Sequence, residues 1–488
     1  MNKVTTLLVF LFLTLNTLVS AQKSEFTLEQ IIERAIDQSP AAKQAETRKE
    51  NRYWQYRVYR SNYNPQLRLS GAAPGYIKAF DPVQQPDGTI GFLPVNQINS
   101  QVNVGLEQPI PWTGGDISVN SNLFYFDVLG DNIDNKLYRG SPFNISLFQP
   151  VFAFNELKWD KKTEPLRYEE SKREFVEQKE AISRVAVDRY FDYMLAQINL
   201  QIAEFNLANN DTIYKIEEGR YNIGTTSRNN LLQVELQLLR SKQDVTQAKL
   251  DLETARLRLR SFIGISAATE FNLTLPEEIP QFEVKYAEAL QYAKDNRADF
   301  LAFERRRLEA DREVARAKGQ RFQTNITATF GLNDSGPMLD DVYSDPLAEQ
   351  RANIGFSIPI LDWGRNKARM QTALANERLE DYVIAQDIQD FEQEILTQVR
   401  QFEVIRSQIE ITKKSDEVAQ ERYMVAQNRY LIGKIDITNL NIALTEKDDA
   451  KRSYINALKS FWTAYYDLRR LTLYDFVNEK LLYQPEEE

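Results

Sequence analysis

The stretch RYNIGTTSRNNLLQVE, Arg220–Glu235, returns 209 residues later as RYLIGKIDITNLNIAL, Arg429–Leu444. Both copies keep an arginine, a tyrosine, an Ile-Gly pair, an asparagine and a leucine in register. Glycine permits the left-handed backbone of a sharp reversal, and the serine or aspartate that follows it is a suitable N-cap for a returning helix. The stretch therefore predicts the same helix-turn-helix reversal twice in one chain.

The 209-residue offset extends beyond these turns, which indicates a duplicated chain. FNISLFQPVF, 143–152, matches ANIGFSIPIL, 352–361, at an asparagine, an isoleucine and a proline. Further upstream the offset grows to about 258 residues, where AIDQSP near Ala35 resembles AKDNRA near Ala293, and PQLRLSG resembles QTNITATFG. The difference of about 49 residues places an insert in the first half, at about 76–141.

The sequence patterns in the two halves predict the same order of helices and strands. A helical stretch, about 28–61 or 286–320, leads into an alternating strand, a turn-rich loop, a second alternating strand, a very long helix, the reversal and a returning helix. Apolar and small polar residues alternate along 326–333, as in a half-buried strand or a barrel strand between lipid and lumen. The insert adds the alternating runs QVNVGLE and DISVNSNLFYF across PIPWTGGD, which predicts a further β-hairpin and an exposed loop.

Two stretches of about 65 residues, roughly 156–221 and 363–430, contain few helix breakers. At 1.5 Å per residue each would span roughly 100 Å, and such rods need partner helices along their length. Pro165 is expected either in a first turn capped by Thr163 or at a kink. Heptad seams follow both reversals, with core positions at Leu231, Leu238, Val245, Leu252 and Leu259 and at Ala443, Ala450, Ala457 and Ala464.

Residues 1–21 form an expected secretory signal peptide. Lys3 precedes an apolar run, and Val19 and Ala21 occupy the −3 and −1 positions of a cleavage site before Gln22. No later window is apolar over the ~18 residues of a spanning helix. Residence in a membrane would therefore depend on β-strands or on partners.

Composition excludes several classes of protein. The chain has 60 Lys+Arg against 70 Asp+Glu, a net charge of −10, so we expect no nucleic-acid partner. It contains no cysteine and no histidine, which excludes disulfides, thiolate sites and most Ser-His or zinc hydrolases. Acidic residues fall among basic ones, as in EKDDAKR, 446–452, which is typical of solvated helix faces. We expect no enzyme, cofactor or metal site.

The signal peptide, the paired halves, QPVF and IPILDWG before the long helices, and the twin RYxIG turns resemble the TolC family of outer-membrane factors. The resemblance covers essentially the mature chain. It implies a mainly α fold with a β-barrel portion: a duplicated strand pair and long helical hairpins, which in a homotrimer form a transmembrane β-barrel continued by a periplasmic α-helical barrel. Three chains of four principal strands would give 12 strands, which the insert would extend or cap.

The domain boundaries expected from this plan are a first repeat at 22–263, an inter-repeat segment at 264–284, a second repeat at 285–471 and a tail at 472–488. By resemblance, the inter-repeat segment and the tail would form an equatorial belt around the helices.

The resemblance also implies an outer-membrane channel subunit of a tripartite efflux or type I secretion system. It would passively conduct substrates delivered by an inner-membrane pump and a periplasmic adaptor. The tips, about 220–231 and 429–440, would form the periplasmic entrance and bind the adaptor. The candidate residues there are Arg220, Tyr221, Gly224, Ser227, Asn230, Arg429, Tyr430, Gly433, Lys434, Asp436 and Asn439. A secreted or periplasmic coiled-coil interaction protein without a pore stays open as the alternative.

The second tip departs from the family pattern. Relatives close the entrance with Tyr–Arg–Asp contacts and line it with acidic rings. Tyr430 matches the tyrosine, but Ile435 replaces the arginine, and Asn439 and Ile442 occupy the acidic positions. Lys434 and Asp436 are the nearby charges available to substitute.

Overall fold

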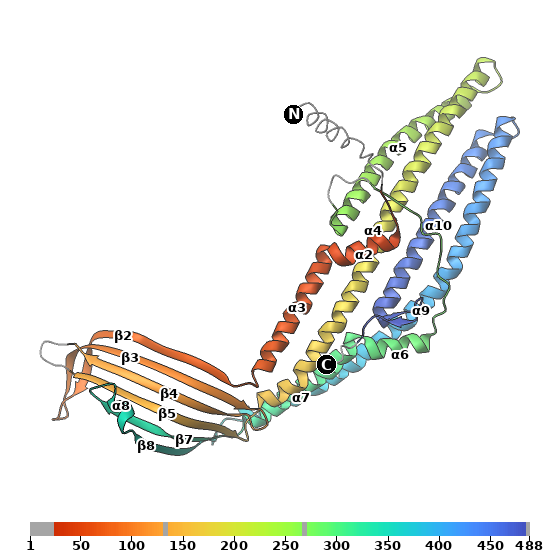
Figure 1. Ribbon diagram of the computed structural model, residues 1–488. Coiled ribbons are helices and arrows are strands. Elements are labelled where there is room, and N and C mark those ends of the chain that lie inside the picture. Colours follow the sequence, from red (N-terminus) through yellow and green to blue (C-terminus); the bar gives the residue numbers. More distant parts are fainter. Residues whose placement is uncertain (1–23, 130–134, 266–270, 485–488) are drawn as a thin grey trace, which may run out of the picture. The chain divides into compact units, whose positions relative to one another are not determined.

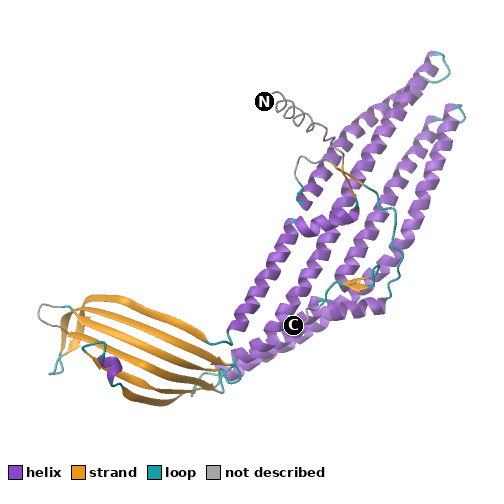
Figure 2. Cartoon of the chain, viewed as in Figure 1, coloured by secondary structure: helices purple, strands orange, loops and turns teal. Residues whose placement is uncertain are grey.

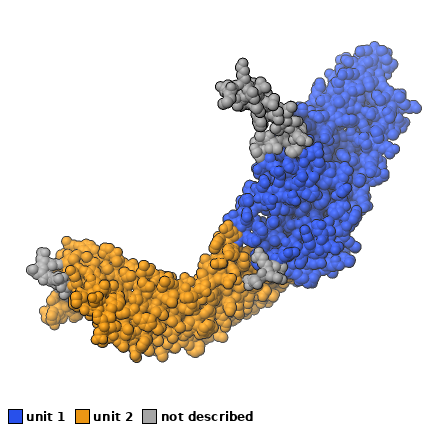
Figure 3. All heavy atoms as spheres, viewed as in Figure 1, with its two compact units in different colours: residues 1–49, 172–297, 389–488 blue, residues 50–171, 298–388 orange. Residues whose placement is uncertain are grey.

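The computed structural model describes residues 24–129, 135–265 and 271–484; Figures 1 and 2 show its helices and strands. The expected signal peptide, 1–21, lies outside the described residues. The chain divides into two units (Figure 3). Unit 1 comprises 1–49, 172–297 and 389–488, and unit 2 comprises 50–171 and 298–388.

Every helix of the first repeat has a counterpart of equal length in the second. The pairs are α2 (Leu28–Gln38) and α6 (Tyr286–Asn296) with 11 residues, α3 (Pro40–Ser61) and α7 (Ala298–Gly319) with 22, α4 (Glu156–Asn222) and α9 (Arg365–Leu431) with 67, and α5 (Arg228–Ile263) and α10 (Ile437–Thr472) with 36. The equal lengths, in the same order, confirm the duplicated plan. The longest helices measure about 100 Å at 1.5 Å per residue.

The first helical stretch of each repeat is broken, so the prediction of one continuous helix there was wrong. Ser39 is extended (ψ 148°) because the residue before Pro40 is driven out of the α region. Its hydroxyl accepts a hydrogen bond from the Ala42 amide at 3.0 Å and so begins α3. Arg297, at the matching position without a proline, has ψ 149°.

Pro165 lies inside α4, which begins at Glu156. The expectation of a first-turn proline capped by Thr163 was therefore wrong. The Thr163 hydroxyl instead donates to the Trp159 carbonyl of the preceding turn, at 3.3 Å.

All the long strands form one six-stranded antiparallel sheet in unit 2, in the order β2-β3-β4-β5-β7-β8. The strands are β2 (Gln66–Gln84), β3 (Ile90–Ile110), β4 (Gly115–Val128), β5 (Asn135–Val151), β7 (Gln323–Gly336) and β8 (Leu347–Ser357). The predicted hairpin is confirmed as β3 and β4, joined at 111–114. The insert at about 76–141 stays a prediction; in the structure Tyr76 lies within β2 and Ser141 within β5.

Side chains alternate between the two faces of this sheet. Registered pairs such as Leu69–Val104, Val119–Ile145 and Ile326–Ile354 place apolar residues on one face. Pairs such as Ser118–Ser146 and Thr329–Arg351 place polar residues on the other. The apolar face is also exposed: Leu67, Leu69, Ile354 and Phe356 are each at least 67% accessible. An exposed apolar face of this size marks a surface that meets lipid or another protein.

Unit 2 also contains a row of four helical segments. The rings of Tyr56 in α3 and Tyr168 in α4 stack with their centroids 4.6 Å apart. Arg305 in α7 pairs with Glu170 in α4 at 2.6 Å. Arg306 in α7 pairs with Asp387 in α9 at 2.7 Å. These contacts give the order α3-α4-α7-α9.

Unit 1 has its own row of helices, α5-α4-α10-α9. Asn210 in α4 donates to Ser241 in α5 at 2.7 Å. Ion pairs such as Lys459–Asp192, at 2.7 Å, join α10 to α4, and Lys451–Asp416, at 3.2 Å, joins α10 to α9. The predicted heptad seams lie within this row: Leu238, Val245 and Leu259 of α5, and Ala443, Ala457 and Ala464 of α10, are buried.

Short strands and the chain tail pack against these helices. β1 (Ser24–Phe26) pairs in parallel with β6 (Phe271–Leu273), and β9 (Tyr474–Asp475) pairs with β10 (Lys480–Leu481). The ring of Tyr474 stacks on Tyr292 of α6 with centroids 3.9 Å apart. The domain boundaries and the belt stay predictions. No helix among the described residues has the length and apolar character to cross a membrane.

A buried ion-pair network joins α4, α10 and the tail. Arg469 contacts the two carboxylate oxygens of Glu180 at 2.8 and 3.0 Å and Asp475 at 3.1 Å. The Tyr465 hydroxyl donates to Asp475 at 2.9 Å. Burial raises the pKa of the Glu180 carboxyl, and the Arg469 guanidinium opposes that rise. Arg469 therefore neutralises two carboxylates that water does not reach.

We expect Arg469→Met to destabilise the protein by about 3–5 kcal/mol, because the substitution leaves buried carboxylates without their counter-ion. Thermal unfolding of the full-length protein would measure this as a lower melting temperature. Arg400→Met is the control, since Arg400 forms a surface pair with Glu403 and its side chain is 71% exposed. Equal melting temperatures for the two variants would contradict the assignment.

Candidate functional site

Two reversals join the long helices of unit 1, and their backbones are alike. The first connects α4 to α5 through residues 223–227, and the second connects α9 to α10 through residues 432–436. Gly224 and Gly433 have φ of +72° and +73°, a left-handed conformation that strains residues with a Cβ. The Thr225 amide donates to the Arg220 carbonyl at 2.9 Å, and the equivalent Lys434 amide donates to Arg429 at 2.8 Å.

Both returning helices begin at the predicted N-cap. The Ser227 hydroxyl accepts a hydrogen bond from the Asn230 amide at 3.2 Å, and the Asp436 carboxylate accepts one from the Asn439 amide at 2.8 Å. The Asn439 side chain donates to the same Asp436 oxygen at 2.9 Å. Such caps satisfy amides that have no partner within the helix. The Asn230 side chain donates to the Thr226 hydroxyl at 3.2 Å, so both asparagines support their turns.

A buried hydrogen bond connects one hairpin to the other. The Tyr430 hydroxyl in α9 donates to Glu217 Oε1 in α4 at 2.7 Å. Arg220 Nη1 lies 3.2 Å from the same oxygen, and its guanidinium carbon lies 5.2 Å from the centre of the Tyr430 ring. Arg220 Nη2 donates to the carbonyls of Tyr430 and Leu431 at 3.4 and 3.3 Å. Arg220 thus places positive charge at the C-terminus of α9, where the helix dipole favours it.

Apolar packing surrounds this contact. The buried cluster contains Ile213, Val234, Tyr423, Tyr430, Ile437, Leu440, Ala443 and Leu444, drawn from all four helices. Burial, and then the hydrogen bond to Glu217, raise the pKa of the Tyr430 phenol. Tyr430 therefore remains a protonated donor at physiological pH.

Glu217 was not predicted as a site residue from the sequence, whereas Arg220 and Tyr430 were. Glu217 corresponds to Ala426 at the 209-residue offset. The second repeat therefore has no carboxylate at the position that could accept a hydrogen bond from Tyr221. Tyr221, the counterpart of Tyr430, is 40% exposed. One signal in the sequence could have indicated Glu217. It is an acidic residue one helical turn before Arg220, and the second repeat has an alanine at the equivalent position.

Lys434 and Asp436 lie outside this cluster. Lys434 is exposed, and the Asp436 carboxylate caps α10. Arg429 is also exposed. The structure thus brings Arg220 and Tyr430 together across the hairpins and leaves the other candidate residues within their own turns.

Both tips also expose apolar side chains. Ile223 and Ile432, equivalent in the two repeats, are 74% and 66% exposed. Tyr221 and Leu431 beside them are also exposed. Both turns therefore place an isoleucine on the surface at the same position.

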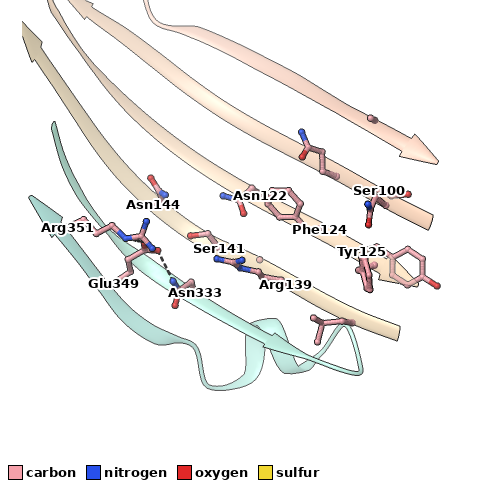
Figure 4. A pocket seen from close by; sticks show the side chains of 16 residues that line it. Ser100, Asn122, Phe124, Tyr125, Arg139, Ser141, Asn144, Asn333, Glu349 and Arg351 are labelled. Carbon is pink, nitrogen blue, oxygen red and sulfur yellow. Dashed lines mark hydrogen bonds and ion pairs between the residues drawn. The ribbon is translucent and has the colours of Figure 1, made fainter. Parts of the chain in front are cut away.

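Unit 2 has a polar pocket, which opens among β2–β5, β7 and β8 (Figure 4). Its lining includes Gln101, Asn122, Asn144, Arg139 and Arg351. Glu349 pairs with Arg351 at 2.7 Å and accepts from Asn333 at 2.8 Å. Within the described ranges, no cluster of acidic side chains is arranged to hold a metal ion.

Comparison with known proteins gives the family. Residues 95–265 and 289–472 match the model of the outer membrane efflux protein family. The chain belongs to this family. The two matched stretches fall one in each repeat, so the duplication is a family property. A search of curated proteins found no match.

Several solved structures are similar in fold. The outer membrane channel CmeC of Campylobacter jejuni matches with a TM-score of 0.66 at 15% identity, over 91% of this chain and 85% of that one. VceC of Vibrio cholerae, an outer membrane protein, matches with a TM-score of 0.63 at 15% identity, over 91% and 95%. The open state of the Neisseria gonorrhoeae outer membrane channel MtrE matches with a TM-score of 0.61 at 16% identity, over 91% and 88%.

We expect Tyr430→Phe to loosen the tips, because a hydrogen bond to a charged group contributes about 1.5–3 kcal/mol. Amide hydrogen exchange of the full-length protein should accelerate about tenfold or more within 213–223 and 423–431. Tyr221→Phe removes the equivalent but exposed hydroxyl and is the matched control. Similar exchange in both variants would show that the contact with Glu217 does not hold the hairpins together.

Proposed function

We propose that this outer membrane efflux protein is the exit duct of a tripartite export assembly. Three copies form the duct, their sheets cross the outer membrane, and their helices extend through the periplasm. An inner-membrane pump and a periplasmic adaptor supply the substrate, which moves through the duct without catalysis.

The observation that carries the proposal is the sheet of unit 2. It has one exposed apolar face, one polar face, and edge strands β2 and β8 that are paired on one side only. In lipid, unpaired backbone groups cost several kcal/mol each, so an open sheet must close on itself or on copies. An apolar outside and a polar inside are the pattern of membrane barrels.

The edges of the helical row in unit 1 support assembly from copies. Val404, Ile411, Val418 and Val425 recur every seven residues on α9 and are each at least 52% exposed. On α5, at the other edge of the row, a second exposed series fits heptad positions: Leu232, Leu236, Leu239, Leu250 and Leu257. Apolar seams of this period pack against another helix. A secreted coiled coil would explain these seams but not the exposed apolar sheet.

The tips are the proposed entrance and adaptor site. Tyr221, Ile223, Leu431 and Ile432 supply exposed apolar contacts. Glu217, Arg220 and Tyr430 fix the two hairpins against each other. We include Gly224, Ser227, Asn230, Arg429, Gly433, Lys434, Asp436 and Asn439 as the residues that shape or surround the turns.

Electron microscopy of the full-length protein, extracted from membranes in mild detergent, tests the duct directly. We expect threefold particles with a detergent belt at one end and recovery of the protein in the outer-membrane fraction. Monomers or dimers without a detergent belt, recovered from the soluble fraction, would replace the duct with the coiled-coil alternative. A photo-crosslinking residue at position 223 or 432 should then capture the adaptor.

We expect the double variant Ile411→Glu, Val418→Glu to lose the trimer, because it places charges in the exposed α9 seam. Native electrophoresis of the detergent extract would report the oligomeric state. Lys413→Glu introduces the same side chain at an exposed position of α9 outside the seam, and should remain trimeric. An intact trimer in the double variant would show that the seam lies outside the subunit interface.

A further inference from the structure

Two strands of the sheet have no helix of their own. β2 follows α3, β5 leads into α4, β7 follows α7, and β8 leads into α9. β3 and β4 instead form a hairpin that occupies the sheet between β2 and β5. This hairpin is the insert that distinguishes the first repeat from the second.

The hairpin is a full part of the sheet. β2 and β3 pair from Gln66–Glu107 to Gln84–Ile90, and β4 and β5 pair from Asp116–Phe148 to Val128–Asn135. Its turn is also anchored, because the Asn155 side chain donates to the Pro111 carbonyl at 2.8 Å. A loop packed over a four-stranded sheet would not form these continuous strand pairings.

Six strands also fit the width of the helical row in unit 2. Strands spaced about 4.8 Å apart and tilted about 40° would occupy roughly 38 Å for six strands, but roughly 25 Å for four. Four helices at about 9 Å spacing occupy roughly 36 Å. The hairpin thus brings the sheet to the width of the helices that lead into it.

We propose that β8 of one copy pairs with β2 of the next, so that six strands from each of three copies close an 18-stranded barrel. The inference rests on the proposed trimeric duct and differs from the 12 strands expected from four principal strands per chain. Because each chain supplies an even number of strands, β8 and the next β2 run antiparallel, and the alternation continues around the ring.

The wider barrel changes the exit of the duct. Barrel diameter grows roughly linearly with strand number, so 18 strands give about 1.5 times the diameter of 12 at the same tilt. The polar face then lines a water-filled channel of porin width, with Arg139, Glu349 and Arg351 among its charges.

Engineered cysteines test this arrangement cleanly, because the native chain has none. Val119→Cys with Ile145→Cys joins neighbouring positions of β4 and β5, and we expect an intrachain disulfide in outer membranes. Leu69→Cys with Ile145→Cys bridges β2 and β5, which are neighbours only if the hairpin leaves the sheet. A disulfide in the second pair but not in the first would overturn the proposal.

The subunit junction needs a separate pair. Cysteines at Leu67 or Leu69 of β2, combined with Ile354 or Phe356 of β8, should give covalent dimers and trimers on denaturing gels. Replacing the β8 cysteine with one at Val104 of the inner strand β3 is the control, and it should give monomers. Covalent oligomers from the control alone would exclude closure through β2 and β8.

Cryo-electron microscopy of the same full-length protein counts the strands. Eighteen strands in a threefold barrel support the inference. A threefold barrel of 12 strands, with the hairpin outside the wall, overturns it and leaves the proposed duct intact. Particles with no barrel would instead refute the proposed function.

Discussion

A sheet with one apolar face and two open edges cannot remain alone in a membrane, and this constraint governs the rest of the structure. β2 and β8 are paired on one side only, so every backbone group on the other side needs a partner. The helical row has the same character, since α5 and α9 expose apolar seams at its two edges. In the proposed duct, neighbouring copies supply the partners of both the sheet edges and the helical seams.

The duplication, the strand alternation, the long helices and the heptad seams could all be predicted from the sequence, because each is a local pattern repeated at a fixed offset. The break at Arg297 could not. Its first-repeat counterpart has Pro40 as a signal, but Arg297 has no proline after it, and its guanidinium lies 3.4 Å from Glu177 in α4. A contact between residues so far apart in the chain cannot be predicted from local sequence patterns.

The bounds of β2 and β5 around the insert and the contact partner of Tyr430 were also beyond the sequence. The difference between the two repeat offsets placed the insert at about 76–141, and strand pairing shows that β2 and β5 extend into that range. Glu217 and Glu218 are adjacent acidic residues on one helix, and only packing shows that Glu217 faces Tyr430. The two tips therefore share a backbone plan while their side-chain contacts have diverged: one tyrosine ties the hairpins together, and its counterpart points to solvent.

The β3–β4 hairpin has a consequence for how such proteins change over evolution. The hairpin adds two strands, so the chain enters β5 from the same end of the sheet with or without it. The strands that connect to helices therefore keep their direction when the hairpin is gained or lost. A single insertion of about 49 residues therefore widens the sheet, and with it the proposed barrel, and leaves the four helical connections as they were. In the proposed duct, the size of the outer opening and the recognition surface at the tips become separately heritable traits, each open to selection without disturbing the other.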